Sequence, residues 1–456
     1  MDQYSDVQQL CVDFISSKTA FSIESDEMGS SERFFFYLDQ GNHDMFLMEV
    51  YQQVFIEDNY DLFIAFIEML YIEGFKSRLV TKTSSILTFE SNNIQMSINI
   101  DQSKLKVAFG LNTTVSYDIN RESYTNLKLL GEGSYGSVYG CCCGTTKCAL
   151  KFQRLYDARD HDEFKILHFL NMQYVDGIIQ VKQFACTLNA FGVNFNIFVM
   201  PLMDCTLCSY VRNNRCTNHF LLTVFRDLLV CLNKIHKLGY YHLDIKPPNI
   251  LVKTLVDAKG RPEPIIKLCD FGLAEKVKQG KYIENISDPK VTSWYRCPIN
   301  SKAEKDKSVF FISWVSDLYA LSVSILQLCS LNSSGHMFSS PAFEVFRKQD
   351  YFIVGTSEIG IHSSREKIRI ACETAIPVDP VDPTNLFFRN LLIEYMDPEN
   401  ILRWYSELQT TPHKNNSVIP EVILKITAYL EHLKQVEVVE SLGSDVDTPP
   451  RPHEPV

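Results

Sequence analysis

Residues 241–252 read Y-H-L-D-I-K-P-P-N-I-L-V and place an acid, a cation and an amide in one short stretch. Asp244 could accept the proton of a hydroxyl group, and Lys246 could neutralise charge on a phosphoryl group during its transfer. The side-chain oxygen of Asn249 is a ligand of the kind that Mg²⁺ prefers. Apolar runs precede and follow the stretch, which predicts a loop held between two buried elements. These residue types therefore indicate metal-assisted phosphoryl transfer.

A second stretch, L-K-L-L-G-E-G-S-Y-G-S-V-Y-G, supplies three glycines between two strand-like segments. Glycine lets a backbone approach phosphate groups closely, although a single glycine-rich loop is a weak signal because turn glycines are common. The next strand pattern, C-A-L-K, ends at Lys151, whose ammonium group could bind phosphate. A third short motif, Asp270-Phe271-Gly272, closes the apolar strand pattern of residues 265–272.

The elements that must position these residues are visible as periodic patterns. Residues 220–239 predict a long amphipathic helix that ends at Gly239 and leads into the Asp244 loop. Residues 157–170 also have helical spacing, and residues 197–203 predict an apolar strand that runs into a linker. Before them, residues 60–75 predict a helix and residues 85–109 predict strands. Residues 1–120 contain no catalytic constellation, so a regulatory or partner-binding role is preferred for them.

In this order, the motifs resemble those of the protein kinase superfamily. The Asp244 stretch is similar to the kinase catalytic loop, H-R-D followed by four residues and N, except that Leu243 replaces the arginine. The resemblance covers about residues 124–430. It implies an α+β bilobal kinase fold, with a β-rich N-lobe over 121–203 and a helical C-lobe over 204–433. An α+β extension over 1–120 would precede the N-lobe, and an acidic, proline-rich, disordered tail over 434–456 would follow the C-lobe.

The resemblance also implies a role for each candidate catalytic residue. Asp244 would orient the acceptor hydroxyl, and Lys246 would stabilise the group in transfer. Lys151 would bind the α and β phosphates of ATP while paired with Glu163; the alternative is that Glu163 is a solvent-exposed helix acid. The interval from Lys151 to Glu163 is short for the family, which suggests that the helix lacks its usual first turn. ATP and Mg²⁺ are the implied cofactors.

Further residues are assigned to metal, nucleotide and substrate. Asn249 and Asp270 would hold Mg²⁺. The implied nucleotide-binding residues are Gly131, Gly133, Gly136, Val138, Lys151, Met200, Leu202 and Met203. The stretch V-T-S-W-Y-R-C-P resembles the substrate-binding end of the activation segment in relatives of cyclin-dependent kinases. There Thr292 would bond Asp244 and Lys246, and Arg296 would help to shape a pocket for proline after the acceptor. The implied activity is a serine/threonine protein kinase directed toward proline.

Two other functions remain open beside it. One is a pseudokinase scaffold that binds nucleotide or partners without turnover. The other is a small-molecule kinase, which is disfavoured because V-T-S-W-Y-R-C-P resembles a site for an extended peptide. Two departures keep the first alternative open: the short interval from Lys151 to Glu163, and Leu243 in place of the family's arginine. In many kinases this arginine binds a phosphorylated residue of the activation segment. We therefore predict that activity does not require phosphorylation of Tyr282, Ser287 or Ser293. Where the family has an ion pair, the chain has Ile299 and Ile401, which we expect to be in contact.

Composition narrows the possible partners and the location. The net charge of −11 and the pI near 5.5 argue against direct binding of nucleic acid. The polar start of the chain lacks a signal-peptide pattern, so the fourteen scattered cysteines are expected to be reduced thiols inside a cell. Cys141–Cys143 and Cys148 are not favoured as metal ligands, because neighbouring strand residues face opposite ways. The apolar run 309–331 contains Asp317, which favours a buried helix over a membrane span.

The only indication of the source of the chain is the way in which its sequence departs from the kinase motifs. The missing catalytic-loop arginine, the short lead to Glu163 and the unrelated extension resemble divergent protein kinases of large DNA viruses, particularly those shared by herpesviruses. The expected location is therefore the cytoplasm or the nucleus, with the host nucleus or the virion implied by a viral origin. Protein substrates and ATP are the expected partners, together with a partner for residues 1–120.

Overall fold

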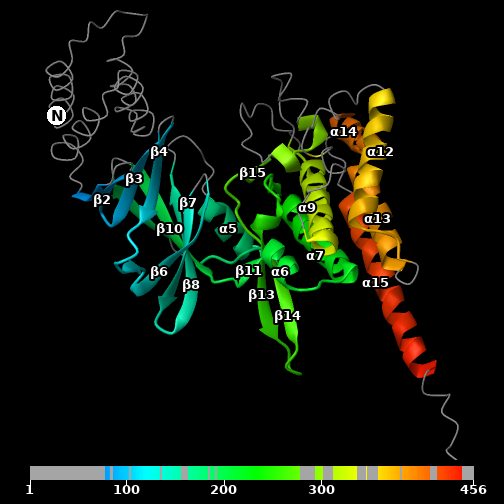
Figure 1. Cartoon of the computed structure of the whole chain (residues 1–456), viewed down its shortest axis with the longest axis horizontal. Coiled ribbons are helices and arrows are strands. Elements are labelled where there is room, and N and C mark those ends of the chain that lie inside the picture. Colours follow the sequence, from blue (N-terminus) through cyan, green and yellow to red (C-terminus); the bar gives the residue numbers. More distant parts are fainter. Residues whose placement is uncertain are drawn as a thin grey trace, which may run out of the picture. The chain divides into compact units, whose positions relative to one another are not determined.

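The structure is a computed structural model (Figure 1). It describes residues 78–82, 86–101, 104–133, 136–155, 163–182, 185–190, 193–277, 293–300, 312–335, 346, 358–379, 383–410 and 418–443. The described residues form two compact units. The first contains residues up to Phe164 together with Val181–Leu202, and the second contains Lys165–Gln180 and residues from Met203 onward. Each unit is described separately below.

The first unit is built on a six-stranded antiparallel sheet in the order β5-β6-β7-β8-β10-β9. The strands are β5 (Tyr117–Ile119), β6 (Glu122–Gly133), β7 (Gly136–Cys143), β8 (Thr146–Arg154), β9 (Ala185–Ala190) and β10 (Val193–Pro201). Strand β8 continues past Lys151, where the sequence pattern had placed its end. Helix α5 (Glu163–Met172) contributes its first residues to this unit.

A second sheet of four antiparallel strands precedes it, in the order β1-β2-β3-β4. Its strands are β1 (Arg78–Lys82), β2 (Ile86–Ser91), β3 (Ile94–Asp101) and β4 (Lys104–Leu111). The turn between β2 and β3 uses Asn92 and Asn93, whose φ values of 50° and 64° suit the tight turns of β-hairpins. The strands predicted over residues 85–109 are confirmed. The helix predicted over residues 60–75 lies outside the described residues.

Strand β4 packs against one face of the six-stranded sheet. Successive residues of a strand point to opposite faces, so Phe152 and Lys151 of β8 belong to different faces. The ring of Phe109 in β4 lies 5.2 Å from that of Phe195 in β10, on the Phe152 face. The backbone N–H of Leu111 donates a hydrogen bond of 2.9 Å to the hydroxyl of Tyr139 in β7. The described part of the extension is therefore continuous with the core of the first unit.

The second unit is mainly helical. Within the described residues it contains most of α5 and the helices α6 (Leu207–Asn213), α7 (Asn218–Lys237), α9 (Trp314–Ser334), α12 (Glu358–Ala375), α13 (Pro383–Met396), α14 (Pro398–Thr410) and α15 (Val418–Gly443). Helix α7 begins after Thr217, whose hydroxyl accepts from the N–H of Phe220, and it ends before Gly239 in left-handed conformation. The helix predicted over residues 220–239 is thereby confirmed.

Two small sheets complete the second unit. Strands β11 (Cys205–Thr206), β13 (Ile250–Val256) and β14 (Pro262–Leu268) form one, and β12 (Tyr240–Tyr241) pairs with β15 (Glu275–Lys276) in the other. The loop between α7 and β13 is thus held by a long helix at one end and a strand hairpin at the other. This is the arrangement that the apolar runs around Asp244 predicted.

Helix α9 occupies the centre of the second unit, in contact with α7, α12 and α13. By length and composition it could cross a membrane, but 94% of its most apolar window is buried inside the molecule. Burial among other helices accounts for its apolar composition, which agrees with the buried-helix interpretation of this run.

The C-terminal boundary differs from the prediction. The structure continues helix α15 through residues 434–443, where the sequence was interpreted as disordered. This interpretation was wrong for those residues because K-Q-V-E-V-V-E-S-L contains no proline and several good helix formers, and Gly443 ends the helix. The proline-rich residues 444–456 lie outside the described residues.

Candidate active site

Lys151 and Glu163 form a buried ion pair in the first unit. The Nζ atom of Lys151 lies 2.8 Å from Oε1 and 2.6 Å from Oε2 of Glu163. Glu163 is only 1% exposed and Lys151 is 8% exposed. The alternative that Glu163 is a solvent-exposed helix acid is therefore wrong, and the predicted pairing is confirmed. Residues 156–162 lie outside the described residues. The expectation that the helix lacks its usual first turn therefore stays a prediction.

The glycine-rich segment forms the hairpin between β6 and β7. Gly133 and Gly136 are opposite each other across it. Gly136 has a φ of 157°, and a Cβ atom there would lie 2.0 Å from the carbonyl oxygen of Phe152. Only glycine fits so close to strand β8. Gly131 is opposite Val138, and Val138 is opposite Lys151, so these residues follow one line across the sheet.

The predicted nucleotide-binding residues Met200, Leu202 and Met203 lie at the end of β10 and directly after it. Met200 is opposite Ala149 in β8 and is buried on the same face as Lys151. Pro201 follows it opposite Cys148. The chain passes from the first unit to the second between Leu202 and Met203. The polypeptide thus changes units where the sequence predicts that an apolar strand runs into a linker.

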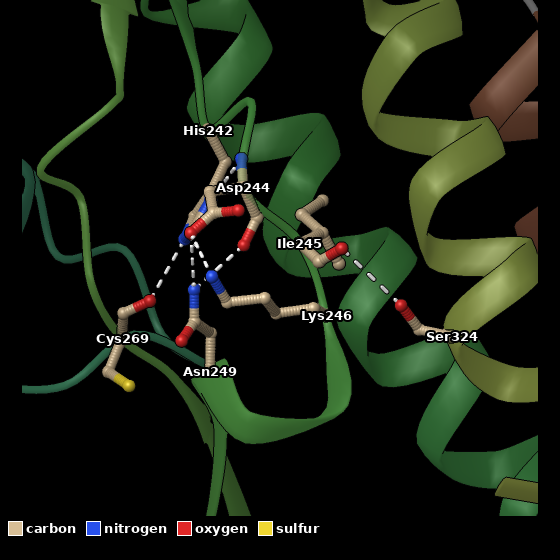
Figure 2. A network of polar contacts seen from close by, with 7 residues as sticks. All are labelled: His242, Asp244, Ile245, Lys246, Asn249, Cys269 and Ser324. Atoms are coloured by element: carbon tan, nitrogen blue, oxygen red, sulfur yellow. Dashed lines mark hydrogen bonds and ion pairs between the residues drawn. The ribbon is translucent and has the colours of Figure 1, made fainter. Parts of the chain in front are cut away.

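In the second unit the candidate catalytic side chains converge on Asp244 (Figure 2). The Nζ atom of Lys246 donates to Oδ2 of Asp244 at 2.7 Å. The amide nitrogen of Asn249 donates to the backbone oxygen of Asp244 at 2.8 Å and to Oδ2 at 3.1 Å. With its amide nitrogen turned toward Asp244, Asn249 keeps its amide oxygen for another partner. One carboxylate is thereby oriented by a cation and an amide.

Asp317 of helix α9 is hydrogen-bonded to the loop that contains Asp244. Its carboxylate accepts the backbone N–H groups of His242 and Leu243, both at 2.9 Å. The Nε2 atom of His236 lies 2.8 Å from the same group. These contacts hold Leu243 at a φ of 63°, a left-handed conformation that costs a residue with a branched side chain about 1–2 kcal/mol. The resemblance to protein kinases implies that Asp317 hydrogen-bonds the backbone of this loop, and these contacts confirm that expectation, whereas His236 was missed.

The pKa of Asp317 reflects this arrangement. Burial by itself would raise the pKa of the carboxyl group, but the hydrogen bond and charge of His236 and the N–H of His242 hold it below its ordinary value. A depressed pKa in the folded state adds stability above the unfolded pKa of about 3.9, and this stability is lost as the pH falls through the folded value.

We therefore predict that Asp317→Asn lowers the free energy of unfolding at pH 7 by about 1.5–3 kcal/mol, because a charged acceptor for two buried N–H groups is lost. The difference from wild type should shrink as the pH falls below about 4. Urea unfolding curves of both proteins, measured from pH 7 to acid, check this. A difference that stays constant over the whole range would contradict the linkage to Asp317.

The two predicted metal ligands lie at neighbouring strand ends. The N–H of Cys269 donates to the backbone oxygen of Asn249 at 2.9 Å, which places Asp270 directly after this contact. Asp270 has a φ of 65°. Phe271 is buried with its ring 4.5 Å from that of His242, whose Nε2 lies 3.0 Å from the oxygen of Cys269. A carboxylate and an amide oxygen fit Mg²⁺, which usually takes one or two protein ligands together with phosphate oxygens.

The candidate substrate residues are only partly described. Arg296 is buried, and it follows Tyr295, whose hydroxyl is hydrogen-bonded to Gln327 of α9. Thr292 lies outside the described residues. Ile401 is buried and Ile299 is half-buried, and their proposed contact stays a prediction.

Two acidic residues of the segment 396–400, M-D-P-E-N, have a partner that the sequence did not reveal. Arg365 of α12 donates to Asp397 at 2.8 Å and also pairs with Glu399. No local pattern links α12 to this segment, so only the tertiary structure could identify the pair.

The cysteines near Lys151 lie on alternating faces, as predicted. Cys141 and Cys148 are opposite each other across β7 and β8, and Cys142 is opposite Lys147. Burial raises the pKa of the Cys141 thiol to about 12. Both buried thiols are therefore protonated near neutral pH.

Comparison with known proteins agrees with the fold and with these motifs. Residues 124–337 match the family model of the protein kinase domain. These matches support the assignment of residues 124–337 to the protein kinase superfamily.

Among its curated relatives is mitogen-activated protein kinase p38b of Drosophila melanogaster, 30% identical over 40% of this chain and 50% of the relative. Mitogen-activated protein kinase 14 of Xenopus laevis is 29% identical over 39% of this chain and 47% of the relative. Mitogen-activated protein kinase mpk-1 of Caenorhabditis elegans is 26% identical over 39% and 40%, respectively. The chain thus spans half or less of the length of these relatives.

Proposed function

We propose that this protein transfers the γ-phosphoryl group of ATP to serine or threonine hydroxyl groups of proteins. The observation that carries the proposal is the network around Asp244, in which Lys246 and Asn249 both donate to one carboxylate. A carboxylate oriented in this way can accept a hydrogen bond from an acceptor hydroxyl and take its proton as the phosphoryl group is transferred. Lys246 is close enough to neutralise the charge that develops on that group.

The other residues are assigned by their chemistry. Asn249 and Asp270 would hold Mg²⁺, which neutralises phosphate charge when it is bound. In the first unit, Lys151 would bind the α and β phosphates, and Glu163 keeps its ammonium group in place. The hairpin of Gly131, Gly133 and Gly136 would present backbone N–H groups to the phosphates. Val138, Met200, Leu202 and Met203 are proposed to contact the adenine.

We further propose that the acceptor is followed by proline and that the protein acts in the cytoplasm or nucleus. Support for proline comes from the W-Y-R sequence, in which Arg296 is buried. Support for a reducing compartment comes from the sequence, in which the fourteen cysteines are irregularly scattered. Residues 1–120 are proposed to include a partner-binding segment.

The test is phosphate transfer from Mg·ATP to a library of serine, threonine and tyrosine peptides, with and without proline after the acceptor. Small-molecule acceptors such as amino sugars are assayed in parallel. Transfer to serine and threonine peptides supports the proposal, and enrichment of proline supports the finer specificity. Transfer to the small molecules alone would identify a small-molecule kinase, and nucleotide binding without transfer would identify a scaffold.

Activity is expected without phosphorylation of the activation segment. Leu243 replaces the arginine that would bind a phosphorylated residue, so the loop has lost that cation. We predict that phosphatase-treated protein retains its rate within about twofold, since no charge pair is broken by removal of the phosphate. Phosphate content is measured by mass spectrometry beside the transfer rate. Loss of activity on treatment, with recovery after phosphorylation of Tyr282, Ser287 or Ser293, would contradict this.

A further inference from the structure

Six residues of the six-stranded sheet form a buried patch on the face opposite Lys151, which we call the outer face. They alternate with residues of the Lys151 face and are at most 4% exposed. They are Tyr139, Leu150, Phe152, Phe195, Ile197 and Val199. A sheet face of this kind must be covered by another layer to leave water. Strand β4 of the extension supplies part of that layer.

Three consecutive residues of β4, Phe109, Gly110 and Leu111, make the contact, and we call them the β4 clamp. The Phe109 ring lies 5.2 Å from the Phe195 ring, with the guanidinium of Arg154 5.5 Å from its centroid. Leu111 donates its N–H to the hydroxyl of Tyr139. The clamp thus combines an aromatic contact, a cation–π contact and a buried hydrogen bond.

Gly110 allows the clamp to approach the sheet this closely. A Cβ atom at this position would lie 2.8 Å from the hydroxyl oxygen of Tyr139, which is closer than Cβ atoms come to other atoms. Any side chain at residue 110 would therefore push β4 away from β7 or displace Tyr139. The close approach is a specific fit between the extension and the kinase sheet.

The β4 clamp is connected through the sheet to Val138 and Lys151, which lie on the opposite face. Phe195 stacks on Phe152 with ring centroids 4.8 Å apart and planes at 14°. Phe152 follows Lys151 in β8, and Tyr139 follows Val138 in β7. Because neighbouring strand residues point to opposite faces, Phe152 and Tyr139 lie on the outer face, and Lys151 and Val138 lie next to them on the other face. Movement of Phe152 would move the Cα atom from which the Lys151 side chain extends.

We propose that the β4 clamp positions Lys151 for phosphate binding, with Phe109 as the positioning residue. The inference rests on the proposed function, and it assigns a task to part of the extension. Lys151 must keep its place relative to Glu163 and to the phosphates, and small displacements of binding groups have large effects on rate. A covered outer face limits how far β8 can bend.

The test compares Phe109→Leu in the full chain with wild type. Leucine keeps apolar bulk but loses the ring contact and the cation–π contact. The KM for ATP should rise about three- to tenfold, with the KM for peptide unchanged, as expected for a small displacement of one phosphate-binding group. Phe109→Tyr keeps the ring and should restore the wild-type value. Gly110→Ala should raise the KM for ATP in the same direction as Phe109→Leu.

Two controls separate positioning from general loss of stability. Ala108→Ser changes an exposed neighbour on the same strand and should leave the KM unchanged. Phe388→Leu removes a buried ring from helix α13 of the second unit, and it too should leave the KM for ATP unchanged. An equal rise of the KM in Phe388→Leu would overturn the proposal, because stability alone would then explain the effect.

A readout without catalysis keeps this test independent of the proposed function. Hydrogen exchange of nucleotide-free protein should speed up at the β7 and β8 amides in Phe109→Leu and Gly110→Ala, and at α7 and α9 in neither. If wild type transfers no phosphate, the proposed function fails and the exchange result still decides whether the clamp stabilises the Lys151 strand. Unchanged exchange in β7 and β8 would overturn the proposal whatever the activity.

Discussion

Asp244→Asn is expected to lower kcat by about 10²- to 10⁴-fold while the protein stays folded, because a positioned general base contributes that much to catalysis. Asparagine has nearly the same shape as aspartate, but its amide cannot take a proton from the acceptor hydroxyl. It also loses the charge that accepts from Lys246 at 2.7 Å and from Asn249 at 3.1 Å. Steady-state transfer to the best library peptide measures the loss.

The matched control for this change is Asp227→Asn, the same substitution on helix α7. Its side chain is 53% exposed and pairs with Arg226 next to it. Pairs of this kind contribute little, so we expect kcat to stay within about twofold of wild type. Thermal unfolding of all three proteins shows whether the fold is kept. If Asp244→Asn transferred phosphate at the wild-type rate, Asp244 would not be the base.

Lys151→Met should abolish transfer and also destabilise the first unit. Methionine leaves the Glu163 carboxylate buried without its cation, a situation that costs about 3–5 kcal/mol in buried pairs. Loss of the Lys151 ammonium group therefore lowers both the activity and the stability of the protein. Denaturant unfolding measures the stability, and peptide phosphorylation measures the activity. Mg·ATP should no longer raise the melting temperature, since ligand binding to the folded state is what raises it.

The double variant Lys151→Met with Glu163→Leu separates the two effects. Replacement of both charges by apolar residues of similar size removes the unpaired carboxylate, so stability should return to within about 1 kcal/mol of wild type. Transfer should remain absent, because no cation is left for the phosphates. Recovery of activity in the double variant would show that Lys151 has only a structural role. Unchanged stability of Lys151→Met would show that Glu163 is not buried with it.

Much of the catalytic loop followed from the sequence because its members are close neighbours along the chain. Asp244, Lys246 and Asn249 share one loop, so their contacts need only the local turn that follows helix α7. Strand alternation likewise predicted that Cys141 and Cys142 face opposite ways. Helix α7 was predicted from its amphipathic spacing and its terminal glycine, and the structure adds the Thr217 cap.

The C-terminal part of the chain was predicted less well. Helix α15 passes through residues whose acidity suggested disorder. The charge of a segment affects its solubility, but it does not decide whether the segment forms a helix. Helix formation depends on the helix propensity of the residues and on packing, and helix α15 packs against α7. The part of the segment without proline could therefore continue the helix.

By itself, the sequence determined the order of motifs, the chemistry of each side chain and the local elements that carry them. Only the tertiary structure decided that His236 contacts Asp317 of α9, that Arg365 pairs with Asp397, and that β4 covers part of the outer face. Each of these contacts joins segments far apart in the chain. Local periodicity reports which face of an element is apolar, but it does not report which distant element will cover that face.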